Sequence, residues 1–222
     1  MDLVDARVGK WKISYINNDE WIGPYIAGGG EWESWMRQDI MHGYRPGTDI
    51  LDIGGNIGCN SLMFSDYGPV HAFEPLFFDI LQKNASQNQT KHPITVHPIG
   101  LSDENTKKQI YFPEKRNGLC NYGGCSVKPQ SGIYSSESST IDLCRLDDVY
   151  SGIPSVMKID VENNELEMLK GAEKTIRKHM PYIIIEVHNP DANPVPNYLH
   201  SLGYDTVIAR PHANYAFFKK IV

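Results

Sequence analysis

From residue 49 onward, short apolar segments alternate along the chain with segments of helical spacing. The expected strands cover residues 50–53, 69–73, 94–99, 155–160, 182–187, 204–209 and 214–219. The expected helices cover residues 57–66, 77–88, 163–178 and 194–202. Strands separated by helices are typical of a doubly wound, mainly parallel α/β sheet. The last two strands have no helix between them, so we expect an antiparallel pair at the edge of a seven-stranded sheet.

Two segments depart from this alternation. Residues 1–48 are rich in aromatic side chains, with a short alternating segment at 11–16 and helical spacing at 31–44. Residues 113–137 are rich in Gly and Ser and have no regular pattern. We therefore divide the chain into an N-terminal segment, 1–48, expected to act as a lid over a ligand site, and a main domain, 49–222. Long irregular loops of this kind often carry function, so we expect residues 113–137 to face the substrate.

Acidic side chains stand at four of the five parallel strand ends. In a doubly wound sheet, ligands bind beyond the carboxyl ends of the strands. The acids at or near these ends are Asp52, Glu74, Asp160, Glu162 and Glu186. The remaining strand is followed by Ser102 and Asp103, and His188 comes two residues after Glu186. Several carboxylates at one edge indicate a ligand site.

The turn after the first of these strands is nearly free of side chains. It reads "LDIGGNIG", and Gly54 and Gly58 permit a close approach of the backbone to a ligand. The helix that follows presents free N–H groups. The turn lacks the G-x-G-x-x-G pattern of dinucleotide-binding proteins. Glu74 follows the glycines by about the 20 residues expected for a carboxylate that binds ribose hydroxyls, which predicts a cofactor containing adenosine.

Six segments in order resemble the FkbM family of S-adenosylmethionine-dependent O-methyltransferases, which have the Rossmann-like class I methyltransferase fold. They are "LDIGGNIGCNSLMF", "VHAFEPLFFDILQKNASQN", "IGLSD", "STIDLCRLDDV", "MKIDVENNELEMLKGAEKTI" and "PYIIIEVHN", within residues 49–189. The chain departs from the family pattern in two places: Asn163 replaces the usual Gly, and Gly55 replaces a common Ala.

The resemblance implies a role for each matching residue. Asp52, Gly54 and Asn56 would line the methionine part of S-adenosyl-L-methionine. Glu74 would bind the ribose hydroxyls, and Pro75 would shape the adenine slot. Ser102 and Asp103 would flank the adenine, and Asp160 would lie below the sulfonium. The acceptor would be a hydroxyl of a sugar, a glycan or a similar small molecule.

A hydroxyl acceptor must lose its proton during transfer, and the candidates are Asp160, Glu162, Glu186 and His188. Two routes remain open. Asp160 and Glu186 would together hold a divalent cation such as Mg²⁺ or Mn²⁺, which makes a bound hydroxyl more acidic. In the metal-free route, His188 takes the proton and Glu186 orients it. Trp21, Tyr25, Trp32 and Trp35 are candidates for an acceptor floor, although aromatic side chains more often belong to a core.

Two further motifs have ordinary structural interpretations. In "LDDV", Asp147 and Asp148 predict a helix cap rather than a ligand site. In the expected helix 163–178, the spacing of Leu166 and Leu169 predicts a buried face and places Glu165 on the solvent-exposed face.

Composition narrows the class of partner. The chain has 21 Lys and Arg, 27 Asp and Glu and a net charge of −6, with no basic run, so we expect neither nucleic acid nor an anionic membrane as a partner. No leader-like start and no apolar run of about 20 residues is present, which favours the cytoplasm. Free thiols are expected at Cys59, Cys120, Cys125 and Cys144.

The sequence leaves the acceptor class and the exact enzyme class open. A non-sugar small molecule or a protein could be the acceptor, and a different enzyme with an adenosine cofactor could use the same sheet. An NAD-dependent enzyme should carry G-x-G-x-x-G and a Tyr-x-x-x-Lys pair, which we do not find. The sequence decides neither the oligomeric state nor whether the chain is one domain of a longer protein.

Overall fold

The central element of the fold is a mainly parallel sheet. The computed structural model describes residues 1–188, 192–210 and 215–220. Within them, the sheet has seven strands in the order β11–β12–β10–β9–β3–β4–β5. Their bounds are β3 Asp49–Ile53, β4 Val70–Phe73, β5 Ile94–His97, β9 Pro154–Ile159, β10 Tyr182–Glu186, β11 Tyr204–Arg210 and β12 Tyr215–Lys220. The doubly wound, Rossmann-like sheet expected from the sequence is confirmed.

Strand direction changes only toward one edge of this sheet. Strands β5, β4, β3, β9 and β10 are parallel to one another. Strand β12 is antiparallel to both β10 and β11. The first residue of the expected strand 214–219, Asn214, lies outside the described residues. The strand order reverses between β3 and β9, because β4 and β5 lie on one side of β3 and β9 and β10 on the other. This is the point at which such sheets bind ligands.

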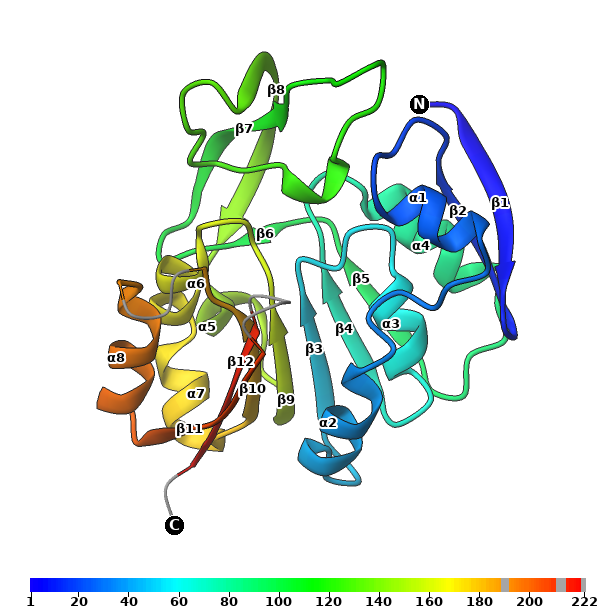
Figure 1. Ribbon diagram of the computed structural model, residues 1–222. Coiled ribbons are helices and arrows are strands. Elements are labelled where there is room, and N and C mark those ends of the chain that lie inside the picture. The colour runs from blue at the N-terminus through cyan, green and yellow to red at the C-terminus, as the bar shows by residue number, and fades with distance from the viewer. Residues whose placement is uncertain (189–191, 211–214, 221–222) are drawn as a thin grey trace.

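Helices cover both faces of the sheet (Figure 1). One face packs against α5 (Leu146–Val149), α6 (Glu165–Gly171), α7 (Glu173–His179) and α8 (Pro194–Ser201) through a buried apolar cluster. The other face packs against α2 (Met36–Gly43) and α3 (Cys59–Phe64). The helix α4 spans Phe78–Ser86 and packs on β5.

Two expected helices are shorter than the sequence indicated. The helix expected over 163–178 is divided into α6 and α7 at Ala172 (φ −112°, ψ 7°). Next to this break, Gly171 packs so closely that a Cβ there would lie 1.9 Å from the Ser102 carbonyl oxygen. The helix expected over 31–44 begins only at Met36, because Glu33 has a left-handed backbone with φ 49°. A left-handed residue cannot continue a right-handed helix.

The chain between β5 and β9 forms a small second sheet, whose strands lie mostly outside the irregular segment 113–137. Its strands are β6 (Gly100–Leu101), β8 (Tyr134–Cys144) and β7 (Thr106–Pro113), in that order. A short 3₁₀ turn, Tyr122–Gly124, lies in the loop between β7 and β8. Figure 1 shows this sheet beyond the carboxyl ends of β3 and β4. The second sheet therefore faces the edge at which a ligand is expected.

The N-terminal segment is packed into the domain as a hairpin followed by a helix. Strands β1 (Leu3–Val8) and β2 (Trp11–Ile16) are antiparallel, and α1 covers Ile22–Ala27. Trp11 is only 4% exposed and belongs to an apolar cluster that also contains Ile80 of α4. Deleting the hairpin would expose this core, so point substitutions are the better test of the segment.

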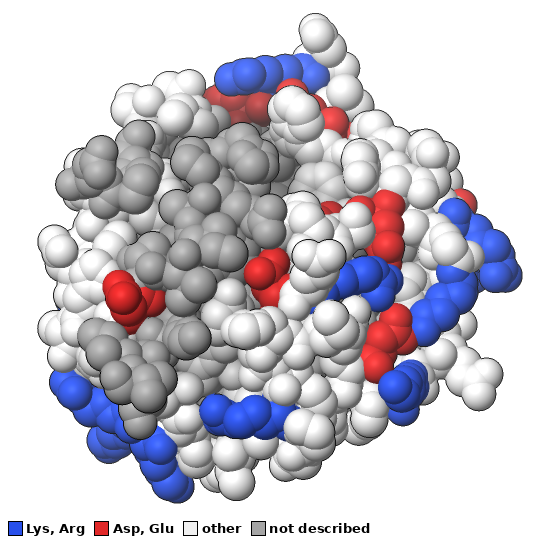
Figure 2. All heavy atoms as spheres, turned by 60° about the horizontal axis from the view of Figure 1, so that its bottom comes forward, with Lys and Arg blue, Asp and Glu red and all other residues white. Residues whose placement is uncertain are grey.

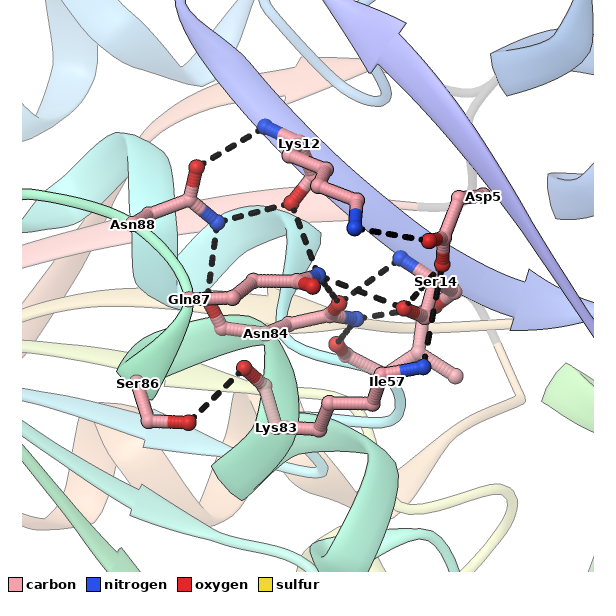
Figure 3. A network of polar contacts seen from close by, with 9 residues as sticks. All are labelled: Asp5, Lys12, Ser14, Ile57, Lys83, Asn84, Ser86, Gln87 and Asn88. Atoms are coloured by element: carbon pink, nitrogen blue, oxygen red, sulfur yellow. Dashed lines mark hydrogen bonds and ion pairs between the residues drawn. The ribbon is translucent and has the colours of Figure 1, made fainter.

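A buried amide fastens the hairpin to the glycine turn (Figure 3). Asn84 of α4 is fully buried, and its Nδ2 donates to the Ser14 carbonyl at 2.9 Å and to the Ile57 carbonyl at 2.7 Å. Its Oδ1 accepts from the Ser14 N–H at 2.7 Å. Ile57 lies between Gly54 and Gly58, so one side chain holds the hairpin and the turn together.

The surface mixes charges of both signs. Figure 2 shows one face, on which Lys and Arg side chains lie in separate groups, several of them beside Asp or Glu. The described residues on that face therefore form no broad basic surface. None of the helices in the described ranges is long and apolar enough to cross a membrane. All four cysteines are free thiols, and Cys120 and Cys125 are buried.

Candidate functional site

A cavity of about 710 Å³ lies at the carboxyl ends of the central strands. Its floor comes from residues that follow β3, β4, β9 and β10, and its other walls come from the small sheet and the N-terminal segment. Seven of the residues predicted from the sequence line it: Gly54, Asn56, Glu74, Pro75, Asp160, Glu162 and Glu186. The parallel topology brings them together because each follows the end of a neighbouring strand.

The glycine turn brings two strand ends into close contact. Gly54 has φ 78°, and a Cβ at this position would lie 1.7 Å from the carbonyl oxygen of Asp160. Only glycine fits such a position, because the contact leaves no room for a Cβ and the left-handed backbone disfavours one. Asn56, at φ 48°, is also left-handed. The cavity is therefore bordered here by main chain.

Glu74 holds the same turn from the side of β4. Its Oε2 accepts from the Asn56 N–H at 2.9 Å, and its Oε1 accepts from the N–H groups of Leu76 at 2.8 Å and Phe77 at 3.1 Å. Burial raises the pKa of Glu74, and these three N–H donors oppose the rise. Each carboxylate oxygen can accept two hydrogen bonds, so Oε2 can take one further donor. Glu74 lines the cavity, and that donor can come from a ligand.

A buried lysine that sequence reasoning missed stands below the turn. Lys158 is 2% exposed, and its Nζ donates to the Gly54 carbonyl at 3.0 Å and lies 3.4 Å from Asp160 Oδ2 and 3.9 Å from Asp52 Oδ1. Burial lowers the pKa of Lys158, but Asp160, Asp52 and Glu33 raise it by more. It is therefore an ammonium. Its sequence signals are its place inside the apolar strand "SVMKI" and within the matching segment "MKIDVENNELEMLKGAEKTI", where the resemblance gave it no role.

Glu33 and Asn60 are two further cavity residues that were not predicted. Asn60 Nδ2 donates to Glu33 Oε2 at 2.6 Å. Glu33 has a left-handed backbone, a conformation that non-glycine residues adopt at a cost and often at functional sites. Glu33 stands in no motif, and Asn60 lies in the matching segment "LDIGGNIGCNSLMF" without an assigned role, so only the three-dimensional contact identifies them.

The structure corrects the expected positions of Asp52, Ser102 and Asp103, since none of them lines the cavity. Asp52 is fully buried behind the wall, where its Oδ2 accepts from the Ser61 hydroxyl. Ser102 is fully buried as well, and its Oγ lies 3.3 Å from Asp103 Oδ1. Gly100 and Leu101 line the cavity instead. The expected strand 94–99 ends at His97, and the chain then pairs with β8, which turns Ser102 away.

Glu162 and Glu186, which line the cavity, form a compact group with His188, which does not line it and instead borders a second hollow beside Asn163. One ligand atom of each lies within 4.8 Å of the others, and His188 Nε2 is 3.3 Å from Glu186 Oε1. Burial raises the pKa of Glu186, and Asp160 and Glu162 add to the rise; burial and the charge of Asp160 likewise raise the pKa of Glu162. Asp160, the other metal ligand expected from the sequence, is not in this group, but its side chain contacts Glu186.

Aromatic side chains border the cavity on the side of the N-terminal segment. Trp21 and Trp32 line it, and Trp21 is 59% exposed. Tyr25 packs edge-on against Trp32, with 5.7 Å between ring centroids. Trp35 packs instead against the core beneath α2. Tyr122 of the expected substrate-facing loop also lines the cavity, so both segments that depart from the alternation border it.

Comparison with known proteins identifies the family. The model of the methyltransferase FkbM domain matches residues 52–206. The chain is 32% identical over 149 residues to the hexuronic acid methyltransferase AglP of Haloferax volcanii, a match that covers 63% of this chain and 56% of that protein. It is 27% identical over 185 residues to the 31-O-demethyl-FK506 methyltransferase FkbM of Streptomyces tacrolimicus, a match that covers 68% of this chain and 70% of that protein.

A solved structure shows the same fold. The methyltransferase FkbM of Methylobacillus flagellatus matches with a TM-score of 0.54 and 22% identity, covering 78% of this chain and 43% of that one. This chain thus spans little more than half of the Haloferax protein and less than half of the Methylobacillus one. The family model nevertheless covers most of the chain. The chain therefore belongs to the FkbM methyltransferase family.

Proposed function

We propose that this protein is an S-adenosylmethionine-dependent O-methyltransferase whose acceptor is a hydroxyl of a sugar or a similar small molecule. The observation that carries the proposal is the carboxylate of Glu74, which is fixed beside the glycine turn with one acceptor position of Oε2 left over. A ribose hydroxyl fits that position. The hexuronic acid methyltransferase relative supports a sugar acceptor.

The remaining cavity residues suit the other parts of this cofactor. Pro75, Leu101 and Leu143 offer an apolar slot for adenine, and Gly54 and Asn56 offer main-chain groups for the methionine part. Asp160 supplies negative charge near a sulfonium. Bound S-adenosylmethionine would supply the electrophilic methyl group. The protein would hold the acceptor oxygen, the methyl carbon and the sulfur in line, which is the main requirement for such a displacement.

The test is binding followed by turnover. Calorimetric titration with S-adenosylhomocysteine should give a saturable one-site isotherm. Methyl transfer from labelled S-adenosylmethionine should then be screened with hexuronic acids, neutral hexoses and non-sugar alcohols. Binding with turnover of non-sugar acceptors alone would retain the cofactor and replace the acceptor class. Failure of the wild-type protein to bind either cofactor form would contradict the proposal.

We further propose that the acceptor proton leaves to His188, which Glu186 orients across 3.3 Å. The His188→Ala variant should lower kcat by roughly 10²–10⁴-fold, the usual contribution of a general base, with the Kd for S-adenosylhomocysteine unchanged. The His200→Ala variant, at an exposed position on α8, is the control. Equal kcat values in the two variants would contradict the role of His188 as the general base.

The rival route is a divalent cation such as Mg²⁺ or Mn²⁺ held by Glu162, Glu186 and His188. Crowded carboxyl groups with raised pKa values would lose their protons to solvent when such an ion binds. Treatment with EDTA separates the two routes. Unchanged turnover is the result expected for the base, and loss of turnover that Mn²⁺ restores would replace the base with the metal.

We also propose that residues 1–48 supply the acceptor wall rather than a detachable lid, because the hairpin is packed into the core. Trp21→Ala should raise the acceptor KM several-fold and leave thermal stability and S-adenosylhomocysteine affinity almost unchanged, since the side chain is 59% exposed. Met41→Ala, which removes a side chain in a residue that is 66% exposed and away from the cavity, is the matched control. An unchanged acceptor KM in Trp21→Ala would place the acceptor elsewhere.

A further inference from the structure

Lys158 is a charged cavity residue that takes part in neither of the two proposed routes for the acceptor proton. It lines the cavity together with Asp160 and Glu33, and it is 2% exposed. Its Nζ reaches the Gly54 carbonyl, so the ammonium lies directly under the turn that would receive the methionine part of the cofactor. A buried charge of this kind is costly unless other charges compensate it.

The surrounding carboxylates more than compensate that charge. Asp160, Asp52 and Glu33 all raise the pKa of Lys158, so three carboxyl groups face one ammonium in this wall. Burial raises the pKa of Asp52, and Lys158 and the Ser61 hydroxyl oppose that rise. Asp52 is fully buried, and its Oδ1 has no hydrogen-bond partner among the described residues, with the Lys158 ammonium 3.9 Å away. The wall therefore attracts a cation, and Lys158 limits the attraction.

We propose that Lys158 sets the preference of the cavity for the cationic methyl donor over its neutral product. This inference rests on the proposed function. In the reaction the S–CH₃ bond breaks and an O–CH₃ bond forms, the bonding pair stays on sulfur, and the acceptor proton goes to the base. Sulfur thus loses its positive charge during transfer. A wall without the ammonium would bind the sulfonium ground state too tightly, and extra binding of the ground state slows the chemical step.

The test compares a neutral and a cationic ligand of nearly the same shape. S-adenosylhomocysteine is neutral at sulfur, and sinefungin carries an ammonium near that position. At pH 8, Lys158→Met should shift the ratio of the two Kd values toward sinefungin by about tenfold or more, because a unit charge a few ångströms away acts through a low effective dielectric constant. The same variant should lower both KM for S-adenosylmethionine and kcat.

Two further variants keep the test decisive. Lys158→Met combined with Asp52→Asn removes one charge of each sign, and its Kd ratio should return close to that of the wild type. Asp160→Asn removes a negative group and should shift the ratio toward S-adenosylhomocysteine. Asp160→Asn is also the variant to measure if Lys158→Met does not fold.

The outcomes separate this inference from the proposed function. A purely structural role of Lys158 would weaken both ligands alike, and an unchanged ratio in Lys158→Met, or in Asp160→Asn where the former does not fold, would overturn the inference. A wild-type protein that binds neither ligand would instead refute the proposed function.

Discussion

Gly54→Ala is expected to abolish measurable binding of S-adenosylhomocysteine and to lower thermal stability sharply. The new Cβ would lie 1.7 Å from the Asp160 carbonyl oxygen, a backbone atom that cannot move aside without separating the ends of β3 and β9. The left-handed backbone at φ 78° adds about 1–2 kcal/mol for any residue with a side chain. Calorimetric titration and a thermal melt measure the two effects.

Gly47 provides a matched control for this substitution. Its φ is 82°, close to that of Gly54, but a Cβ there would meet no atom within 4 Å. Gly47→Ala should therefore show the backbone cost alone, with cofactor affinity unchanged. Equal losses of stability in the two variants, together with normal binding by Gly54→Ala, would contradict the close contact between the turn and β9.

The sheet and much of the cavity floor could be predicted from the sequence because both depend on local patterns. Apolar runs of strand length, separated by helical spacing, strongly favour a doubly wound sheet. Carboxyl ends of parallel strands then meet at one edge whatever the details of packing. Glu74, Asp160 and Glu186 could be placed in the cavity for that reason, and all three line it.

Side-chain contacts outside the regular strand and helix patterns could not be predicted. Lys158 is one lysine in an apolar strand, and only the structure reveals that Asp52 and Asp160 enclose it. Glu165 was expected on the solvent-exposed face of a helix, yet it is 7% exposed and accepts from the N–H groups of Val161 and Asn163. That expectation was wrong because the chain folds back over the start of the helix.

Tertiary contacts also decide which element a motif serves. Asp147 does act as a helix cap, but it accepts from the N–H groups of Lys174 and Thr175 in the first turn of α7, far along the chain. The pairing of β7 with β8 in the small second sheet, outside the central sheet, was not predicted. The pairing of β6 with β8 then removes Ser102 from the cavity and puts Leu101 there.

Glu74→Gln is expected to raise the Kd for S-adenosylhomocysteine by about 10- to 100-fold, because the amide loses the charge-assisted hydrogen bonds of the carboxylate. It should also cost about 1–3 kcal/mol of stability, since one buried N–H donor of Asn56, Leu76 or Phe77 then faces an amide NH₂. Asp79→Asn is the control, because this exposed acid lies at the start of α4 and outside the cavity.

A cofactor analogue distinguishes two roles of Glu74, which are binding the ribose hydroxyls and holding the glycine turn in place. S-adenosylhomocysteine that lacks the ribose 2′- and 3′-hydroxyls should bind the wild-type protein more weakly than the full compound. In Glu74→Gln the two compounds should bind nearly alike, because the group that distinguishes them has been removed. Such a double cycle cancels the loss of turn geometry, which affects both compounds equally. If the analogue is penalised as strongly in Glu74→Gln as in the wild type, the hydroxyls meet another group, and Glu74 serves only to hold the glycine turn in place.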